Sequence, residues 1–233
     1  MKGSRDPWTS PAVGFLFVAM FATAEFLSPP HPTPDATNQE IAKHFAEHRE
    51  TFIANVYLSG LAMVPAIWFL VIVWRRLRET EGEPAVLSTI ALVSGVSAIT
   101  VTMAASGFHV VLALELDKAL DPSLVRLLYD LGISTLSFIP FALTGFFGAI
   151  AVVALRTGVL PRWLGMGAAL LALLQPPSAL AMFVRTGPFA AGALFGSLTI
   201  TLLMAWTLAL TVVLVLDDRR RSRLVPRVAA GDA

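Results

Sequence analysis

The chain has 233 residues, of which 56% are hydrophobic and only 14% are charged, and its formal net charge is +1. A soluble domain usually carries about a quarter of its residues as charged side chains, so this composition predicts an integral membrane protein. Cysteine is absent, which excludes disulfides, thiolate metal sites and iron–sulfur clusters. The glycine-rich loops that cradle nucleotide phosphates are also missing, and we expect no cofactor.

Six long apolar stretches predict an all-α, polytopic bundle that forms a single membrane domain over residues 1–233. Each stretch is near or above the roughly 20 residues that a helix needs to cross a bilayer. The predicted spans are residues 11–28, 51–74, 84–116, 122–155, 161–184 and 188–216. Helix kinks are expected at Pro140 and at the Gln175-Pro176-Pro177 run, because proline removes a backbone donor.

The basic residues predict the orientation of this bundle. With both termini inside, the inner segments hold 12 Lys and Arg residues and the outer segments hold 5. This bias favours an N-in, C-in protein of the bacterial plasma membrane with a basic cytoplasmic tail over residues 217–233. A cleavable signal peptide remains an alternative for the first span, since Lys2, Arg5 and the Ala22-Thr23-Ala24 sequence imitate one.

The first outer loop is the one sizeable polar segment between spans. It opens with four prolines within six residues, Pro29, Pro30, Pro32 and Pro34. Thr37 and Glu40 then have the spacing of a capping box, which predicts a short helix over residues 37–50. Ile41, Phe45 and Phe52 fall on one stripe of this segment. The helix is therefore expected to lie on the outer membrane surface or to fold over a pocket as a lid.

Ionisable residues inside the spans are the best candidates for chemistry. Counting about 1.5 Å per residue places His109, Glu25 and Asp130 in one band of the outer leaflet. His109 is a candidate proton donor or acceptor, or else a neutral histidine bonded to a backbone carbonyl. Glu25 is either a buried acid or a carboxylate that reaches water at the edge of the membrane. Asp130 is either an acid or the i,i+4 ion-pair partner of Arg126. We expect these three candidate catalytic residues to converge on an outward-facing pocket.

Five polar residues are expected to line the same pocket and to bind its ligand. They are Asn55, Tyr57, Ser106, Gln175 and Arg185. Ser106 shares a face with Ser94, Ala98, Thr102 and His109, and such a face of small and polar groups packs against helices or borders a cavity.

One short motif points to a metal. The sequence His44-Phe45-Ala46-Glu47-His48 matches the H-x-x-E-H pattern of some zinc peptidases. A zinc ion that catalyses hydrolysis is held by three protein ligands, and no further histidine is placed to be the third one. We therefore expect no metal site.

Several local sequences resemble a known group of membrane proteins. They are the proline-rich exit from the first span, Glu47-His48-Arg49, Leu128-Tyr129-Asp130-Leu131-Gly132 and the run from Ala154 to Gly165. Together they are similar to a loosely defined group of actinobacterial six-span proteins of the DUF4386 type. The resemblance implies a helical membrane fold in the bacterial plasma membrane and supplies no activity or site residues.

Three functions stay open on the sequence. The first is binding of a small apolar or lipidic molecule in an outer-leaflet pocket. The second is an enzyme that uses Glu25, His109 and Asp130 for acid–base chemistry on a lipidic substrate. The third is a proton-linked exporter, which ranks last because the inner half of every span lacks charge. The expected partners are the lipid bilayer and a small ligand, with no nucleic acid, and the oligomeric state is left open.

Overall fold

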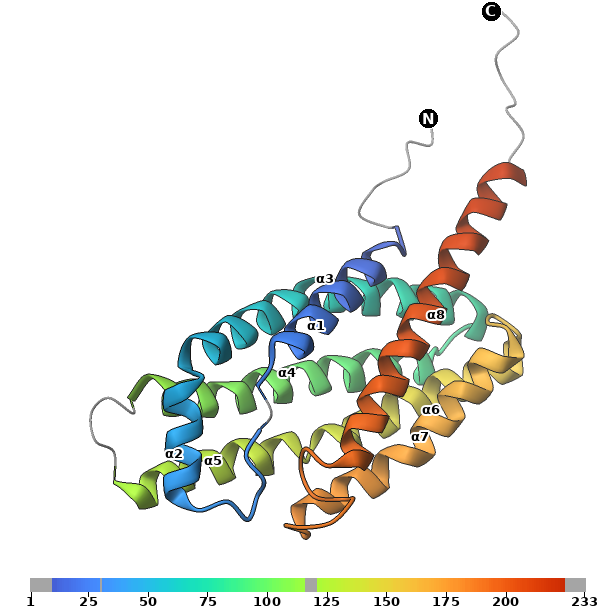
Figure 1. Cartoon of the computed structure of the whole chain (residues 1–233). Coiled ribbons are helices and arrows are strands. Elements are labelled where there is room, and N and C mark those ends of the chain that lie inside the picture. The colour runs from blue at the N-terminus through green and yellow to red at the C-terminus, as the bar shows by residue number, and fades with distance from the viewer. Residues whose placement is uncertain (1–9, 30, 116–120, 225–233) are drawn as a thin grey trace, which may run out of the picture.

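The computed structural model describes residues 10–29, 31–115 and 121–224, with backbone alone at 115 and 221–224. All regular structure among these residues is helical (Figure 1). The elements in chain order are α1 (Val13–Leu27), α2 (Asn38–Glu47), α3 (Arg49–Glu81), α4 (Val86–Glu115), α5 (Pro122–Leu136), α6 (Ile139–Thr157), α7 (Arg162–Ser178), the 3-10 helix η3 (Ala179–Met182) and α8 (Leu194–Leu224).

Five segments of the described chain are long and apolar enough to cross a membrane. They are Arg49–Glu81, Val86–Leu114, Pro122–Thr157, Arg162–Met182 and Leu194–Arg220. This confirms the prediction of a multi-pass helical protein. The expected first span is the shorter α1, whose 15 residues extend about 22 Å, less than the roughly 30 Å of a hydrocarbon core.

The predicted kinks coincide with interruptions of helical structure. α5 ends at Leu136 and α6 begins at Ile139, so Pro140 lies in the first turn of α6, where its missing N–H is tolerated. Pro176 and Pro177 lie in the last turn of α7, which passes directly into η3. Pro140 therefore follows the break between α5 and α6, whereas Pro176 and Pro177 lie just before α7 changes to 3-10 geometry.

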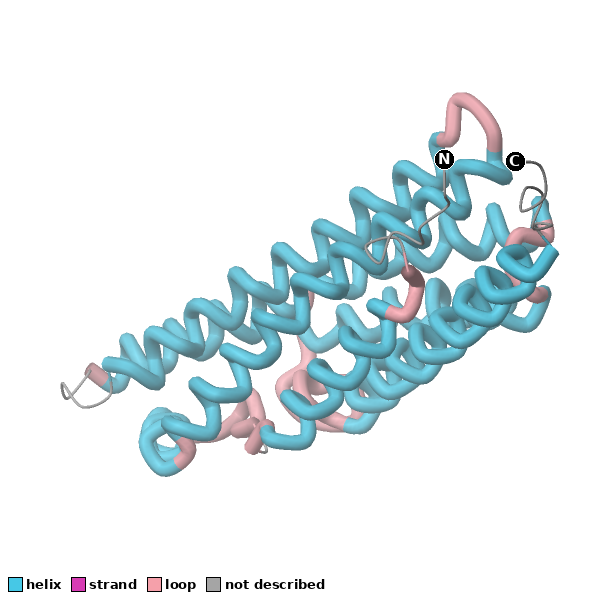
Figure 2. Tube along the Cα trace, turned by 90° about the horizontal axis from the view of Figure 1, so that it is seen from above, coloured by secondary structure: helices cyan, strands magenta, loops and turns pink. Residues whose placement is uncertain are grey.

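α3, α4 and the α5–α6 segment run alongside one another, and α8 crosses the bundle obliquely (Figure 1 and Figure 2). α6 packs between α4 and α7, while α1 packs against α3 and α8. The main core contains large buried side chains from α3, α6, α7 and α8, including Phe69, Phe147, Ile150, Leu164 and Leu210. A hydrogen bond also joins α8 to α7, in which Trp206 Nε1 donates to the carbonyl of Leu164 at 3.0 Å.

α2 crosses one end of the bundle, and this end is called the α2 end (Figure 1). The predicted capping box is confirmed: Thr37 Oγ1 accepts from Glu40 N at 3.2 Å, and Glu40 Oε2 accepts from Thr37 N at 2.7 Å. The helix stops at Glu47, and the chain turns through His48 into α3 instead of continuing to residue 50.

The apolar stripe of α2 faces the protein. Ile41 and Phe45 are fully buried and share a second core with Phe52, Leu112 and Val125. α2 thus packs on α5, α3 and α4, with its apolar stripe directed at the protein.

The opposite end of the bundle carries the α3–α4 and α6–α7 connections, together with the start of α1 and the end of α8 (Figure 1). Glu81 caps α4 there, because its carboxylate accepts from Leu87 N at 2.9 Å and from Ser88 N at 2.7 Å. An ion pair between Arg76 and Asp217 ties α3 to α8.

We predict that Gly14→Ala destabilises the bundle, because α1 approaches its neighbours most closely there. A Cβ at position 14 would lie 2.7 Å from Phe69 Cε2 and would also collide with the Thr211 hydroxyl. Overpacking of this kind costs about 1–3 kcal/mol, measurable as a lower melting temperature in detergent. Gly60→Ala is the matched control, since a Cβ there meets nothing within 4 Å, and equal melting temperatures for the two variants would contradict this packing.

Candidate functional site at the α2 end

The connection from α1 to α2 leaves regular structure, and its residues 31–36 are called the strap. Pro32 and Pro34 have no backbone N–H, and Ala36 N donates to Thr33 O at 2.9 Å. Backbone outside regular structure has no intrahelical donors for its carbonyls, so those carbonyls of the strap that are shielded from water need donors from elsewhere. Those donors come from α5.

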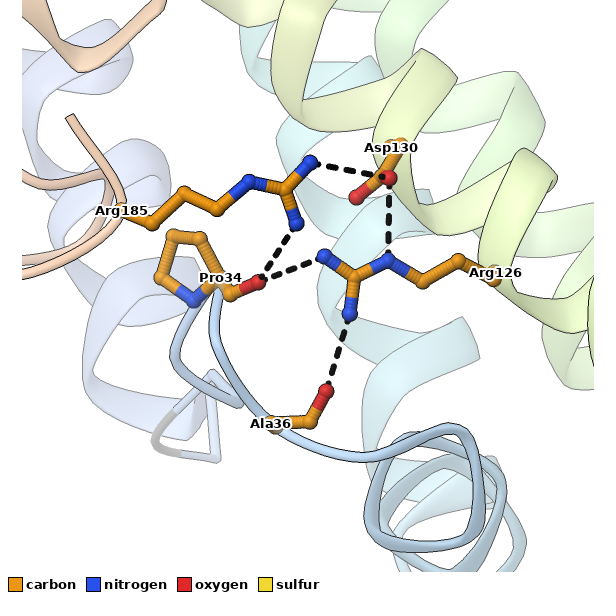
Figure 3. Close-up of polar contacts among 5 residues, drawn as sticks. All are labelled: Pro34, Ala36, Arg126, Asp130 and Arg185. Atoms are coloured by element: carbon orange, nitrogen blue, oxygen red, sulfur yellow. Dashed lines mark hydrogen bonds and ion pairs between the residues drawn. The ribbon is translucent and has the colours of Figure 1, made fainter. Parts of the chain in front are cut away.

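Arg126 of α5 supplies two of the donors (Figure 3). Its Nη1 donates to Ala36 O at 2.9 Å and its Nη2 to Pro34 O at 2.6 Å. Its Nε donates to Asp130 Oδ2 at 2.9 Å, so the i,i+4 pair expected from the sequence is present. One turn away on the same helix, the Tyr129 hydroxyl donates to Pro32 O at 2.5 Å.

A second arginine reaches the same carboxylate from the connection that follows η3. Arg185 Nη2 lies 3.7 Å from Asp130 Oδ2, and Arg185 Nη1 lies 3.4 Å from Pro34 O (Figure 3). Two guanidinium groups therefore share one carboxylate beside the strap. The arrangement joins the α7–α8 connection, the strap and α5.

His109 of α4 is buried beneath α2, with 4% of its surface exposed. Its ring centroid lies 5.9 Å from that of Phe45, 6.3 Å from that of Phe52 and 5.8 Å from that of Tyr129. Phe45, Phe52 and Tyr129 are together called the aromatic cage of His109. The imidazole also rests on Gly132, where any Cβ would collide with it. Among the described residues Nε2 of His109 meets no partner with full hydrogen-bond geometry, and the ring interacts with the backbone of Tyr129.

The other histidines at this end are arranged differently. The rings of His44 and His48 stack with centroids 4.7 Å apart, and His31 meets Phe52 edge to face. Burial lowers the pKa of His44 below its ordinary value, and the neighbouring His48 lowers it further. Glu47 pairs with Lys43 at 3.8 Å. Among the residues described, no three His, Cys, Asp or Glu side chains are grouped to hold a metal ion.

An open hollow of about 430 Å³ lies between the strap and α2. Its lining is mostly polar and consists of Pro32, Thr33, Asp35, Ala36, Glu40 and His44. This is not the apolar pocket that the sequence analysis expected. The apolar environment of His109 is separate from this hollow, because it lies on the buried side of α2 under the ring of Phe45.

The three candidate catalytic residues do not gather around one point. His109 is buried, whereas the side chain of Glu25 is exposed near the end of α1. Counting residues along the span predicts a depth for Glu25 and does not predict the side of the helix on which it lies. Asp130 is engaged by Arg126 and Arg185. No contact among the described residues joins any two of these three side chains.

The five expected ligand-binding residues are also dispersed. Asn55 is buried and its Nδ2 donates to Ala24 O at 2.5 Å, which satisfies a carbonyl in the last turn of α1. Tyr57 is 70% exposed, and Gln175 is buried in α7. Ser106 is half-buried and its hydroxyl donates to Thr102 O of its own helix at 3.0 Å. Arg185 alone of the five lies beside the strap.

Sequence reasoning missed three parts of this site. It did not identify Tyr129 as an anchor of the strap, Phe45 as a wall above His109, or Gly132 as the floor below it. The available signal was the run of prolines, since a segment poor in donors needs donors from elsewhere for its carbonyls. Which residues supply them depends on contacts between distant parts of the chain.

We predict that Tyr129→Phe lowers the free energy of unfolding by about 1 kcal/mol, because it leaves Pro32 O without its donor. The variant should also increase hydrogen exchange of the α2 amides, measured by mass spectrometry in detergent. Tyr57→Phe is the matched control, since that side chain is exposed. The anchoring role is refuted if both variants unfold and exchange as the wild type does.

Comparison with family models, with curated proteins and with solved structures finds no match for this chain. The function is therefore inferred from the residues of the α2 end and their contacts.

Proposed function

We propose that this chain is a multi-pass protein of the bacterial plasma membrane that binds a small apolar or lipidic molecule at its outward-facing α2 end. The charges support this orientation. The opposite end carries most of the arginines, and cytoplasmic segments are enriched in such residues. The described members are Arg75, Arg76, Arg78, Arg156, Arg162, Arg219 and Arg220.

The observation that carries the proposal is the unpartnered Nε2 of His109 inside the aromatic cage. A buried polar atom without a partner costs about 1–3 kcal/mol, and most such atoms in proteins are satisfied. Ligand sites combine apolar and aromatic walls with a few polar groups that orient the ligand. The cage has this composition, and it suits an apolar molecule that carries one hydroxyl or carbonyl group.

Access to the cage requires a movement of α2. Phe45 of α2 covers His109, and the helix is bounded by the irregular strap on one side and by the turn at His48 on the other. Segments bounded in this way act as lids in many binding sites. Rotation of α2 away from α4 and α5 would open the space beneath Phe45 while the long helices stay in place.

The arrangement gives less support to acid–base catalysis by Glu25, His109 and Asp130. Glu25 is exposed, and the carboxylate of Asp130 is held between two guanidinium groups. His109 would then have to act without either carboxylate, which leaves binding as the function that the geometry favours.

The test compares wild type and His109→Phe after purification from native membranes, with extraction and mass spectrometry of bound small molecules. The wild type should retain one defined molecule, and His109→Phe should lose it. Because Nε2 has no protein partner among the described residues, the variant should melt at the same or a higher temperature once the ligand is removed.

A glycine pair controls for general effects on folding. Gly132→Ala places a methyl group against the imidazole and should lower retention, whereas Gly148→Ala meets nothing within 4 Å and should not. A wild type that retains no defined molecule, or a His109→Phe variant that retains the same one, would overturn the proposal.

A further inference from the structure

The two arginines beside the strap differ in how fully their donors are used. Arg126 makes three contacts of 2.6–2.9 Å, and its side chain is 21% exposed. Arg185 makes two longer contacts, of 3.4 and 3.7 Å, and its side chain is 64% exposed. A guanidinium group has five N–H donors. Arg185 therefore keeps donors directed towards its surroundings, while Arg126 is committed to the strap.

The two arginines differ in the negative charge near them, because Asp35 of the strap interacts with Arg126. Two guanidinium groups meet the single carboxylate of Asp130 (Figure 3). Arg126 lies closer to that carboxylate and holds it by a direct hydrogen bond. One positive charge, that of Arg185, is thus only weakly compensated by the residues it contacts.

The position of Arg185 indicates what could compensate it. The residue lies in the connection between η3 and α8 at the α2 end, and the nearby Phe183 is 82% exposed. At the boundary between lipid headgroups and hydrocarbon, arginine side chains extend towards the headgroups and phenylalanine side chains insert on the apolar side. The anionic group available at that level is a phosphate.

We propose that Arg185 binds a phosphate group at the outer rim of the bundle, and that Asp130 is the internal counter-ion with which this phosphate competes. Guanidinium and phosphate groups pair through two parallel hydrogen bonds, a geometry that lysine does not reproduce. This site differs from the one beneath α2 and does not depend on it, since Arg185 makes no described contact with the aromatic cage.

The experiment places the protein in nanodiscs containing phosphatidylcholine and phosphatidylglycerol and counts the retained anionic lipids by native mass spectrometry. Arg185→Gln should lower retention of phosphatidylglycerol about tenfold, the effect expected when one charge-assisted contact is lost. Arg185→Lys should fall between the wild type and Arg185→Gln. Lys43→Gln is the matched control, because it removes a similarly exposed positive charge at the same end.

The Asp130→Asn variant tests whether Arg185 binds phosphate or only pairs with Asp130 to hold the structure together. If the carboxylate competes with phosphate, this variant retains more phosphatidylglycerol than the wild type. A parallel arm adds inorganic phosphate, and displacement of the lipid would assign the site to a free phosphate instead of a headgroup. Unchanged retention in Arg185→Gln, or a loss equal to that in Lys43→Gln, would overturn the proposal.

Discussion

The α2 end depends on one set of contacts, in which side chains of α3 and α5 donate to backbone carbonyls at the end of α1 and in the strap. α1 ends after 15 residues, and the chain continues as the irregular strap. Asn55 of α3 satisfies a carbonyl at the end of α1, while Arg126 and Tyr129 of α5 satisfy three carbonyls of the strap. The prolines reduce the number of donors that need partners. Side chains of the neighbouring helices therefore supply donors to these four carbonyls.

This matching determines where α2 lies. Once the strap is bound to α5, the capping box at Thr37 starts α2 directly above the ends of α4 and α5. Ile41 and Phe45 are then buried, and Phe45 covers His109. The same contacts that satisfy the backbone thus isolate one imidazole from water and leave its Nε2 without a partner. The contacts that satisfy the strap carbonyls are therefore the same contacts that create the proposed binding site around His109.

Local and compositional features of the fold could be predicted from the sequence, because they depend on neighbouring residues. The long apolar helices, the capping box and the interruptions at Pro140 and Pro176 belong to this class. The site was less predictable. Arg126 bonds to a carbonyl 92 residues away, a contact that no local pattern encodes. Counting residues along a span does not predict the side of the helix on which Glu25 lies.

The central claim is that Arg126 holds the strap and therefore positions α2, and distances between spin labels test it most directly. The chain has no cysteine, so Lys43→Cys on α2 and Leu127→Cys on α5 label two exposed positions without background. We expect double electron–electron resonance to give one narrow distance distribution in this background and a broad one after Arg126→Gln is added. The same narrow distribution with and without Arg126 would contradict the account.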